Sequence, residues 1–400
     1  MSKPIFILFT LALLLGIISG DTIVSVVSTF RHGARSPIDK SSWDLGVWPQ
    51  GYGELTPEGY RQHYLNGKEM AYRYIEQAQL ISPKFSVSEI YIRSTDLNRT
   101  VMSVQSQLYG MFSNGPQLAQ TAFNQKAVPP LLNVQNQQQA ITALGEHALP
   151  NGYQPVPVHV VSASYDNMLV GSSIAACPRM AEILQAQQQT DIYKQKVAAY
   201  TQGLQKQISQ VFGITVSYEV AGYMADTLTT DKFHKFDWPP GVTDEMYYQM
   251  YGNQNYTNSY FYTPEASSLA GSQFFQAILD QFDGTISGTS TRKFGFYSAH
   301  DTTLIAFLNF LGVFDGNNPI YASTLIFELH NNNNAYAVHI SYNGASILLD
   351  GCVDPCPYAT FKEMMQEKII ANVTEACQLQ NDEAELSYNY NPYLDINALS

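Results

Sequence analysis

The sequence predicts an α/β protein in which a mainly parallel sheet is flanked by helices and a smaller, mainly helical domain is inserted. Three segments support this prediction, because each carries a strand-like stretch into polar residues, and the last two continue into a helix. These segments occupy residues 22–33, 88–112 and 292–312. With 400 residues the chain is too long for one simple core, so we expect one large domain that carries a smaller one.

The first two segments place basic side chains where a predicted strand ends. Residues 22–30, TIVSVVSTF, are apolar and β-branched, which is typical of a buried strand, and Arg31 and His32 follow at once. In the second segment a short strand ends at Arg93, and the next three residues, Ser-Thr-Asp, offer N-caps to a helix with apolar residues at helical spacing.

The third segment repeats this layout with a strand over residues 293–298, then His300 and Asp301, then a helix rich in Leu, Ile and Phe. Ligands of such sheets bind outside the carboxyl ends of the strands, where helix N-termini favour an anion. The sequence therefore predicts that one edge of the sheet gathers the side chains of Arg31, His32, Arg35, Arg93, His300 and Asp301.

The inserted domain is predicted over residues 121–264, because residues 177–212 have the pattern of helices and their flanks are rich in Gly, Pro, Asn and Tyr. We expect the α/β domain to comprise residues 21–120 and 265–400. Near the end of the chain, residues 322–351 predict a strand meander in which asparagine runs supply the turns.

Charge and the N-terminal residues restrict the partners and the destination. A formal net charge of −13 argues against nucleic acid or an anionic membrane as the main partner, so an anionic substrate needs locally concentrated positive charge. Residues 1–20 have the pattern of a secretory signal peptide cleaved near Asp21; the run is short for the alternative, a membrane anchor. No later stretch predicts a membrane anchor, so we expect secretion or delivery to the lysosomal lumen.

The cysteines and sequons fit this route. An oxidising compartment favours two disulfides among the four cysteines, while a zinc site lacks a CxxC pair and a histidine pattern, so we expect no metal or cofactor. Glycosylation sequons begin at Asn98, Asn255 and Asn372. Asn98 lies on a helix expected to pack near the site, so Asn255 and Asn372 are predicted to be the better acceptors.

The stretch RHGARSP, residues 31–37, resembles RHGxRxP, the motif of the histidine acid phosphatases. Five fixed residues should match by chance on the order of 10⁻⁴ times in such a chain. Other stretches are similar to segments of the family in family order, namely WPQGYGELTPEGYRQHYLNG, IRSTDLNRTVMS, ACPRM, YSAHDTT, PIYAS and GCVDPCP. Within the family the chain looks closest to the prostatic and lysosomal acid phosphatase group.

The resemblance implies a role for each candidate residue. His32 would be the nucleophile that forms a phosphohistidine, and Asp301 the general acid that protonates the leaving oxygen. The phosphate oxygens would be held by Arg31, Arg35, Arg93 and His300. The resemblance also implies the disulfides Cys177–Cys377 and Cys352–Cys356, a histidine phosphatase-like fold, no metal and a homodimer.

Physical chemistry supports these roles and leaves structural alternatives open. Neighbouring arginines disfavour the charged form of His32 and so keep it nucleophilic in acid, but they also lower the pKa of Asp301. We expect the charge of bound phosphate to reverse the second effect. The alternatives are a buried structural histidine for His32, a helix-start salt bridge for Arg93 and an N-cap for Asp301.

The sequence thus predicts a secreted or lysosomal acid phosphatase that hydrolyses phosphate monoesters, including phosphopeptides, through a phosphohistidine. Two alternatives are retained. One is a narrower phosphomonoesterase, either a phytase or a lysophospholipid phosphatase, and the other is an inactive glycoprotein that binds phosphorylated ligands.

Overall fold

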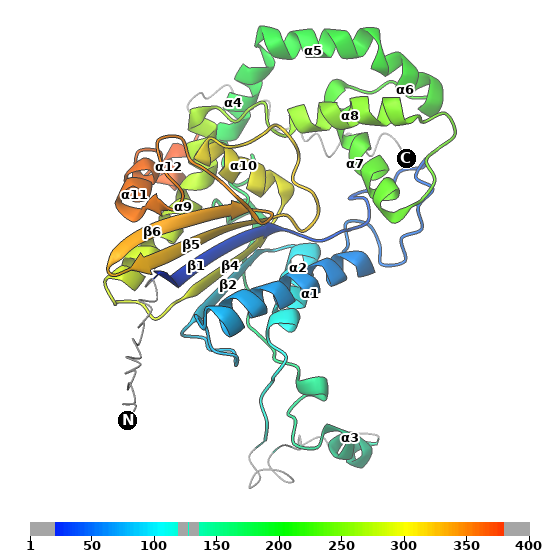
Figure 1. Ribbon diagram of the computed structural model, residues 1–400. Helices are drawn as coiled ribbons and strands as arrows, with labels where there is room; N and C mark the ends of the chain where they lie inside the picture. The colour runs from blue at the N-terminus through cyan, green and yellow to red at the C-terminus, as the bar shows by residue number, and fades with distance from the viewer. Residues whose placement is uncertain (1–20, 119–126, 128–135, 380–400) are drawn as a thin grey trace, which may run out of the picture.

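A computed structural model describes residues 21–118, 127 and 136–379 of the chain (Figure 1). The predicted signal peptide, residues 1–20, lies outside the described residues. Within the described part, no helix combines the length and the apolar composition that a membrane span requires.

A single mixed sheet organises the α/β part of the molecule (Figure 1). Its strands are β1 (Asp21–Arg31), β2 (Ile90–Thr95), β3 (His159–Val161), β4 (Phe294–Ala299), β5 (Thr324–Asn332), β6 (Ala335–Tyr342), β7 (Ala345–Ser346) and β8 (Cys356–Pro357). The spatial order is β3-β2-β4-β1-β5-β6-β7, with β8 also pairing with β6. The strands from β3 to β1 are parallel, whereas β5 to β8 are antiparallel to their neighbours. The predicted α/β class with a parallel core is confirmed.

Helices cover both faces of this sheet, which explains the continuous apolar run in β1. One face packs against α1 (Pro57–Ala71), its π-helical continuation η1 (Tyr72–Gln77) and α2 (Asn98–Met111), and the other against α9 (Pro264–Ile286), α10 (Asp301–Leu311), α11 (Tyr358–Gln366) and α12 (Val373–Ala376) (Figure 1). Val26 and Phe30 join the core on the α1 side, while Val27 joins the core around α9. A strand buried on both faces needs apolar residues at successive positions.

A helical region with its own core lies over the end of the sheet at which β1 ends (Figure 1). It consists of α5 (Asp191–Gln202), α6 (Leu204–Phe212), α7 (Tyr218–His234) and α8 (Asp244–Thr257), and α4 (Arg179–Gln188), which leads into it, packs in the core around α9. The core of the helical region contains Tyr200, Ile208, Met224 and Met250. Ser217 and Thr243 start α7 and α8 as N-caps, each accepting a backbone N–H three residues on.

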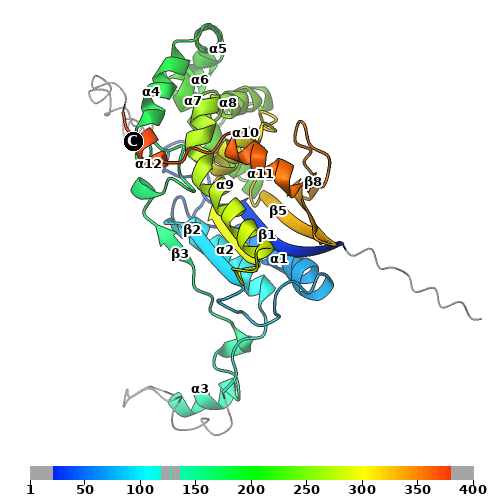
Figure 2. The same ribbon diagram turned by 90° about the vertical axis from the view of Figure 1, so that its left-hand side faces the viewer.

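The range expected for the insertion, residues 121–264, contains one element that belongs to the sheet. β3 falls inside that range and pairs in parallel with β2. A three-residue strand is too short for its alternation to be recognised in a sequence, so this pairing was not predicted. Further short elements in the range are η3 (Pro150–Gly152), η4 (Ala163–Tyr165) and α3 (Gln137–Leu144), which stands away from the body (Figure 2). The division of the chain into domains stays a prediction.

Both disulfides implied by the resemblance are present in the structure. Cys177–Cys377 joins the residue two before α4 to the residue that follows α12, 200 positions apart in the sequence. Cys352–Cys356 closes a short loop before α11. The longer link ties the start of the helical region to the end of the α/β part.

Candidate active site

The loop that follows β1 is held in place by hydrogen bonds from its backbone N–H groups. The N–H groups of His32, Gly33 and Ala34 donate to Ala299 O, Ser103 Oγ and Gln62 Oε1 at 3.0, 3.0 and 2.8 Å. These amides are therefore occupied, and an anion above the loop has to be held by side chains. This differs from glycine-rich phosphate loops, in which the backbone N–H groups contact the phosphate.

Gly33 allows the loop to approach the first turn of α1. A Cβ added at Gly33 would lie 2.5 Å from the carbonyl oxygen of Gly59, a distance that real Cβ atoms do not adopt. The glycine of the motif RHG is thus required by close backbone packing, and this packing fixes the height of His32 above the sheet.

One hydrogen bond fixes the tautomer and the orientation of the His32 ring. Its Nδ1 lies 2.8 Å from the carbonyl oxygen of Gly33. Because a carbonyl only accepts, Nδ1 carries the proton and Nε2 keeps its lone pair. Burial and the charges of Arg99, Arg31 and Arg35 hold the pKa of His32 well below its ordinary value. The ring is therefore neutral under acidic conditions that would protonate an exposed histidine.

His300, the N-cap of α10, lies beside His32 with the ring centroids 5.7 Å apart. Thr100 Oγ1 donates to the carbonyl of Leu97 at 2.8 Å and hence accepts from Thr95 Oγ1 at 2.9 Å. Thr95 Oγ1 therefore accepts a hydrogen bond from the N–H of His300 Nε2, also at 2.9 Å. This chain of hydroxyls fixes the tautomer of His300. Burial of the ring lowers the pKa of His300 to about 3.

Asp301 is the first residue of α10 and is joined to the end of β1. Its Oδ2 lies 2.8 Å from Nη2 of Arg31, and its Oδ1 accepts the backbone N–H of Thr302 at 2.8 Å. Burial raises the pKa of Asp301, but the charges of Arg31 and Arg35 outweigh it and hold the pKa below its ordinary value. The free site thus holds an ionised Asp301 that is poised against a cation.

Two arginines of the motif are pre-oriented by partners. Arg31 donates to the carbonyl oxygen of Pro319 at 2.6 Å, and its guanidinium lies 4.4 Å from the ring centroid of Tyr321. Arg35 binds Asp226 of α7 with two hydrogen bonds of 2.9 and 2.8 Å. The helical region therefore contributes a carboxylate that holds a sheet-edge arginine, a contact that the sequence did not predict.

Arg99 is the arginine that sequence reasoning missed. It lies in the first turn of α2 and lines the cavity together with His32 and Arg35. Burial and the charge of Arg35 lower its pKa to about 10, and no ion pair to it occurs among the described residues. The available signal was its place: it starts a helix that follows a strand, and helix starts share the sheet edge with strand ends.

Arg93 does not line this cavity, which differs from the prediction. Its Nη2 lies 2.5 Å from Oδ1 of buried Asp166, and its Nη1 lies 3.3 Å from the sulfur of Met168. The same Asp166 oxygen accepts the backbone N–H groups of Met168 and Leu169 at 3.1 and 2.9 Å. The guanidinium is thus committed to the loop that starts at residue 166, and Arg93 positions part of the cavity wall.

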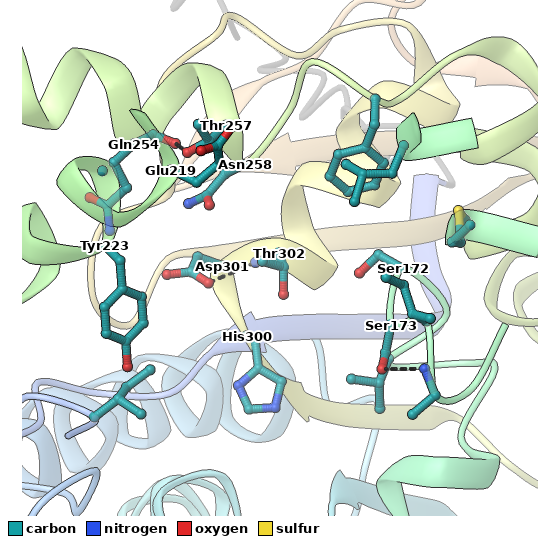
Figure 3. Close-up of a pocket in the computed structure, with 18 of the residues that line it drawn as sticks. Ser172, Ser173, Glu219, Tyr223, Gln254, Thr257, Asn258, His300, Asp301 and Thr302 are labelled. Atoms are coloured by element: carbon teal, nitrogen blue, oxygen red, sulfur yellow. Dashed lines mark hydrogen bonds between the residues drawn. The ribbon is translucent and has the colours of Figure 1, made fainter. Parts of the chain in front are cut away.

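The arginines around His32 share an unusual feature. The Nε atoms of Arg31, Arg35 and Arg99 are buried and have no hydrogen-bond partner among the described residues; the same holds for Arg93. Buried cationic donors are normally paired, so the unpaired Nε atoms of Arg35 and Arg99, which line the cavity, and of Arg31, whose charge acts on His32, indicate a site for an anion. Figure 3 shows this cavity, of about 640 Å³, with His300 and Asp301 in its wall. In the described part of the chain, no group of three or more acidic, His or Cys side chains is arranged to hold a metal.

Acid phosphatases of several animals are similar to this chain in sequence. Lysosomal acid phosphatase of Xenopus laevis is 28% identical over 370 residues, covering 88% of this chain and 78% of that protein. Prostatic acid phosphatase of Rattus norvegicus is 28% identical and covers 90% of this chain and 91% of the relative. Testicular acid phosphatase of Mus musculus is also 28% identical, with 90% and 83% covered.

Solved structures of similar fold include phytases. A Hafnia alvei phytase in complex with tartrate has a TM-score of 0.62 at 14% identity, covering 90% of this chain and 99% of that one. The phytase from Citrobacter braakii has a TM-score of 0.61 at 13% identity, covering 90% and 100%. The model of the histidine phosphatase superfamily (branch 2) matches residues 22–343. The chain therefore belongs to branch 2 of the histidine phosphatase superfamily, the histidine acid phosphatases.

Proposed function

We propose that the protein is an acid phosphatase that hydrolyses phosphate monoesters through a phosphohistidine on His32. The observation that carries this proposal is a neutral, buried His32 whose free Nε2 is surrounded by arginines with unpaired Nε donors. Phosphoryl transfer depends mainly on positioning and on charge stabilisation, and this arrangement supplies both. Attack by Nε2 on phosphorus forms the N–P bond while the ester P–O bond breaks.

Arg31, Arg35 and Arg99 hold the phosphate oxygens in this proposal. Arg99 takes the role that the resemblance implied for Arg93, because it lines the cavity and has no carboxylate partner. Asp226 fixes the plane of the Arg35 guanidinium and leaves its Nε for the ligand. His300 provides the wall beside His32, with its Nε2 proton committed to Thr95.

Asp301 is the general acid that protonates the leaving oxygen. In the free site its pKa is low because Arg31 and Arg35 stabilise the carboxylate. A bound phosphate neutralises the same arginines, which raises the pKa of Asp301 in the complex and allows it to take up a proton. In the second step water attacks the phosphohistidine, Asp301 accepts a proton from that water, and the N–P bond breaks to release phosphate and the neutral His32.

The first experiment is phosphate release from p-nitrophenyl phosphate between about pH 3 and pH 8, with and without EDTA. We expect activity that is greatest in acid, because the pKa of His32 is lowered and the ring stays nucleophilic there. EDTA should have no effect, and quenching in alkali, in which the N–P bond of phosphohistidine is stable, should trap a labelled phosphoenzyme. Phosphate binding without turnover at any pH would instead support the inactive, ligand-binding alternative.

Replacing Arg99 or Arg93 by alanine tests which of the two holds the phosphate. Arg99→Ala is expected to lower kcat/KM for p-nitrophenyl phosphate by roughly 10²- to 10³-fold, because a donor to the transferring phosphoryl group is lost. The matched control Arg93→Ala should retain kcat/KM within about tenfold and instead lower the melting temperature, since Asp166 loses its buried partner. A larger kinetic loss in Arg93→Ala than in Arg99→Ala would return the role to Arg93.

Secretion or lysosomal delivery, glycosylation and dimerisation are further parts of the proposal. The two disulfides fit an oxidising compartment, and curated relatives are described as lysosomal acid phosphatases. The side chains of Asn98 and Asn372 are exposed, whereas Asn255 is half-buried and accepts the backbone N–H of Asn318 at 3.2 Å. This supports Asn372 as the better glycan acceptor and gives Asn98 a clearer path to solvent than the sequence suggested.

A further inference from the structure

The cavity above His32 continues well beyond the arginines, and its outer part has a different charge. The inner end holds His32, Arg35, Arg99 and Asp301. The outer part is formed by α4, the loop at residues 170–175 and the facing ends of α7 and α8. Among the described residues that line this outer part there is no Lys, Arg or His, and Glu219 is the one carboxylate.

Glu219 lies with neutral polar groups on one side of the cavity. Figure 3 shows it grouped with Gln254, Thr257 and Asn258, with Asp301 between this group and His300 in that view. None of these four side chains carries a positive charge. An anionic substituent placed here would therefore meet a carboxylate and amide or hydroxyl dipoles without a compensating cation.

The remaining wall of the outer part is mainly hydrocarbon, and its polar members, Ser172, Ser173, Gln188, Tyr223 and Tyr260, are uncharged. Its apolar members come from the loop at residues 170–175, from α4, from the start of α7 and from the segment after α8, and they are Val170, Ile174, Met180, Leu184, Val220 and Phe261. The whole cavity, about 640 Å³, falls within the size of sites that enclose small organic ligands. It thus has room for a hydrocarbon group beside a phosphate held at His32.

We propose that this apolar wall binds the leaving group, so that the preferred substrates carry a single phosphate on an alcohol with an alkyl or aryl substituent. The proposal rests on the proposed function, because it extends the same site from the phosphate to the group beyond it. It opposes a phytase-like specificity: the additional phosphates of an inositol polyphosphate would be buried beside Glu219 and hydrocarbon, where no cation pairs with them.

The test uses n-alkylphosphonates, whose C–P bond is not hydrolysed, so binding is measured separately from turnover. Dissociation constants for the butyl to octyl members are obtained by titration calorimetry on the full mature chain. Burying a methylene is favourable, so affinity should rise about two- to threefold for each added carbon. Myo-inositol hexakisphosphate should bind more weakly than octylphosphonate at moderate ionic strength.

Two lysine substitutions on one helix locate the effect. Leu184→Lys places a charge in the apolar wall and should flatten the chain-length dependence while binding of butylphosphonate stays within about threefold. The control Ala186→Lys adds the same charge two residues on, where the side chain is exposed and outside the cavity lining, and should keep the wild-type dependence. Comparable melting temperatures verify that both variants are folded.

The outcomes separate this inference from the proposed function. A flat series in the wild-type protein, or tighter binding of inositol hexakisphosphate than of octylphosphonate, overturns the apolar leaving-group site even if p-nitrophenyl phosphate is hydrolysed. A graded series that Leu184→Lys abolishes supports it even if turnover is absent, in which case the proposed function alone fails. An equal loss of grading in Ala186→Lys would show that charge, and not the cavity wall, is responsible, and would overturn the assignment.

Discussion

His32→Ala is expected to lower kcat for p-nitrophenyl phosphate by at least about 10⁴-fold, since the attacking group is removed and no neighbouring side chain replaces it. The Nε2 lone pair of His32 is freed by the hydrogen bond from Nδ1 to Gly33 O, and an alanine offers no atom in its place. His300, the nearest imidazole, has its Nε2 directed at Thr95. Rapid quenching in alkali with labelled substrate should therefore trap a phosphoenzyme in the wild-type protein and none in the variant.

Phosphate binding provides the control for His32→Ala. The arginines keep their partners in the variant, because Arg31 and Arg35 are held by Asp301 and Asp226 and not by His32. Inorganic phosphate should thus bind with an affinity within about tenfold of wild type, and the near-UV circular dichroism spectrum, which reports tertiary packing, should be unchanged. A variant that folds, binds phosphate and still turns over at more than a few per cent of the wild-type rate would refute the nucleophilic role.

Asp301→Asn is expected to have an effect that depends on the leaving group. For an alkyl phosphate, whose alkoxide needs a proton, we expect kcat/KM to fall about 10²- to 10⁴-fold, the usual contribution of a general acid. For p-nitrophenyl phosphate, whose leaving group departs unprotonated, the loss should be much smaller. The asparagine keeps the size of the side chain and its Oδ1 contact with Thr302, but it carries no titratable proton.

The pH profile adds a second readout for Asp301. The pKa of Asp301 is lowered in the free site by the charges of Arg31 and Arg35. In the proposed mechanism Asp301 therefore takes up its proton only after phosphate binds. Wild-type kcat for the alkyl phosphate should therefore fall as the pH rises through the pKa of Asp301 in the complex, and this limb should be missing in Asp301→Asn. Equal losses on both leaving groups would assign Asp301 to orienting Arg31 through their 2.8 Å ion pair instead of to proton transfer.

Local sequence was sufficient for the sheet-edge part of this site. Continuous apolar strands followed at once by His32 and by Asp301 predicted parallel strands that end at one edge, and the structure has β1 and β4 paired in parallel with Arg31 opposite Ala299. This succeeded because the signals are short-range: strand pattern, polar residue and helix start lie within a few positions of one another. Because parallel strands end at the same edge of a sheet, the residues that follow them come together even when they are distant in the sequence.

The proposal that Arg99 holds the phosphate in place of Arg93 rests on the tertiary structure. Both arginines lie near the end of β2, and the sequence offers no local difference in how far each guanidinium reaches. Arg93 is held by Asp166, 73 residues away, whereas Arg99 has no carboxylate partner among the described residues and faces the cavity. A carboxylate captures whichever cation the fold places beside it, and that placement is not encoded near either arginine.

What the sequence determined by itself was the family motif and the order of the strand–helix units, and from the motif it predicted His32 and Asp301 as the reacting pair. The tertiary structure decided the surroundings of these groups. Asp226 of the helical region orients Arg35 across 191 positions, and α4 with the loop before it gives the outer cavity a mainly hydrocarbon wall without a cation. The physical reason is that strands and helices follow from neighbouring residues, whereas charge pairing and cavity walls depend on packing between segments remote in the chain.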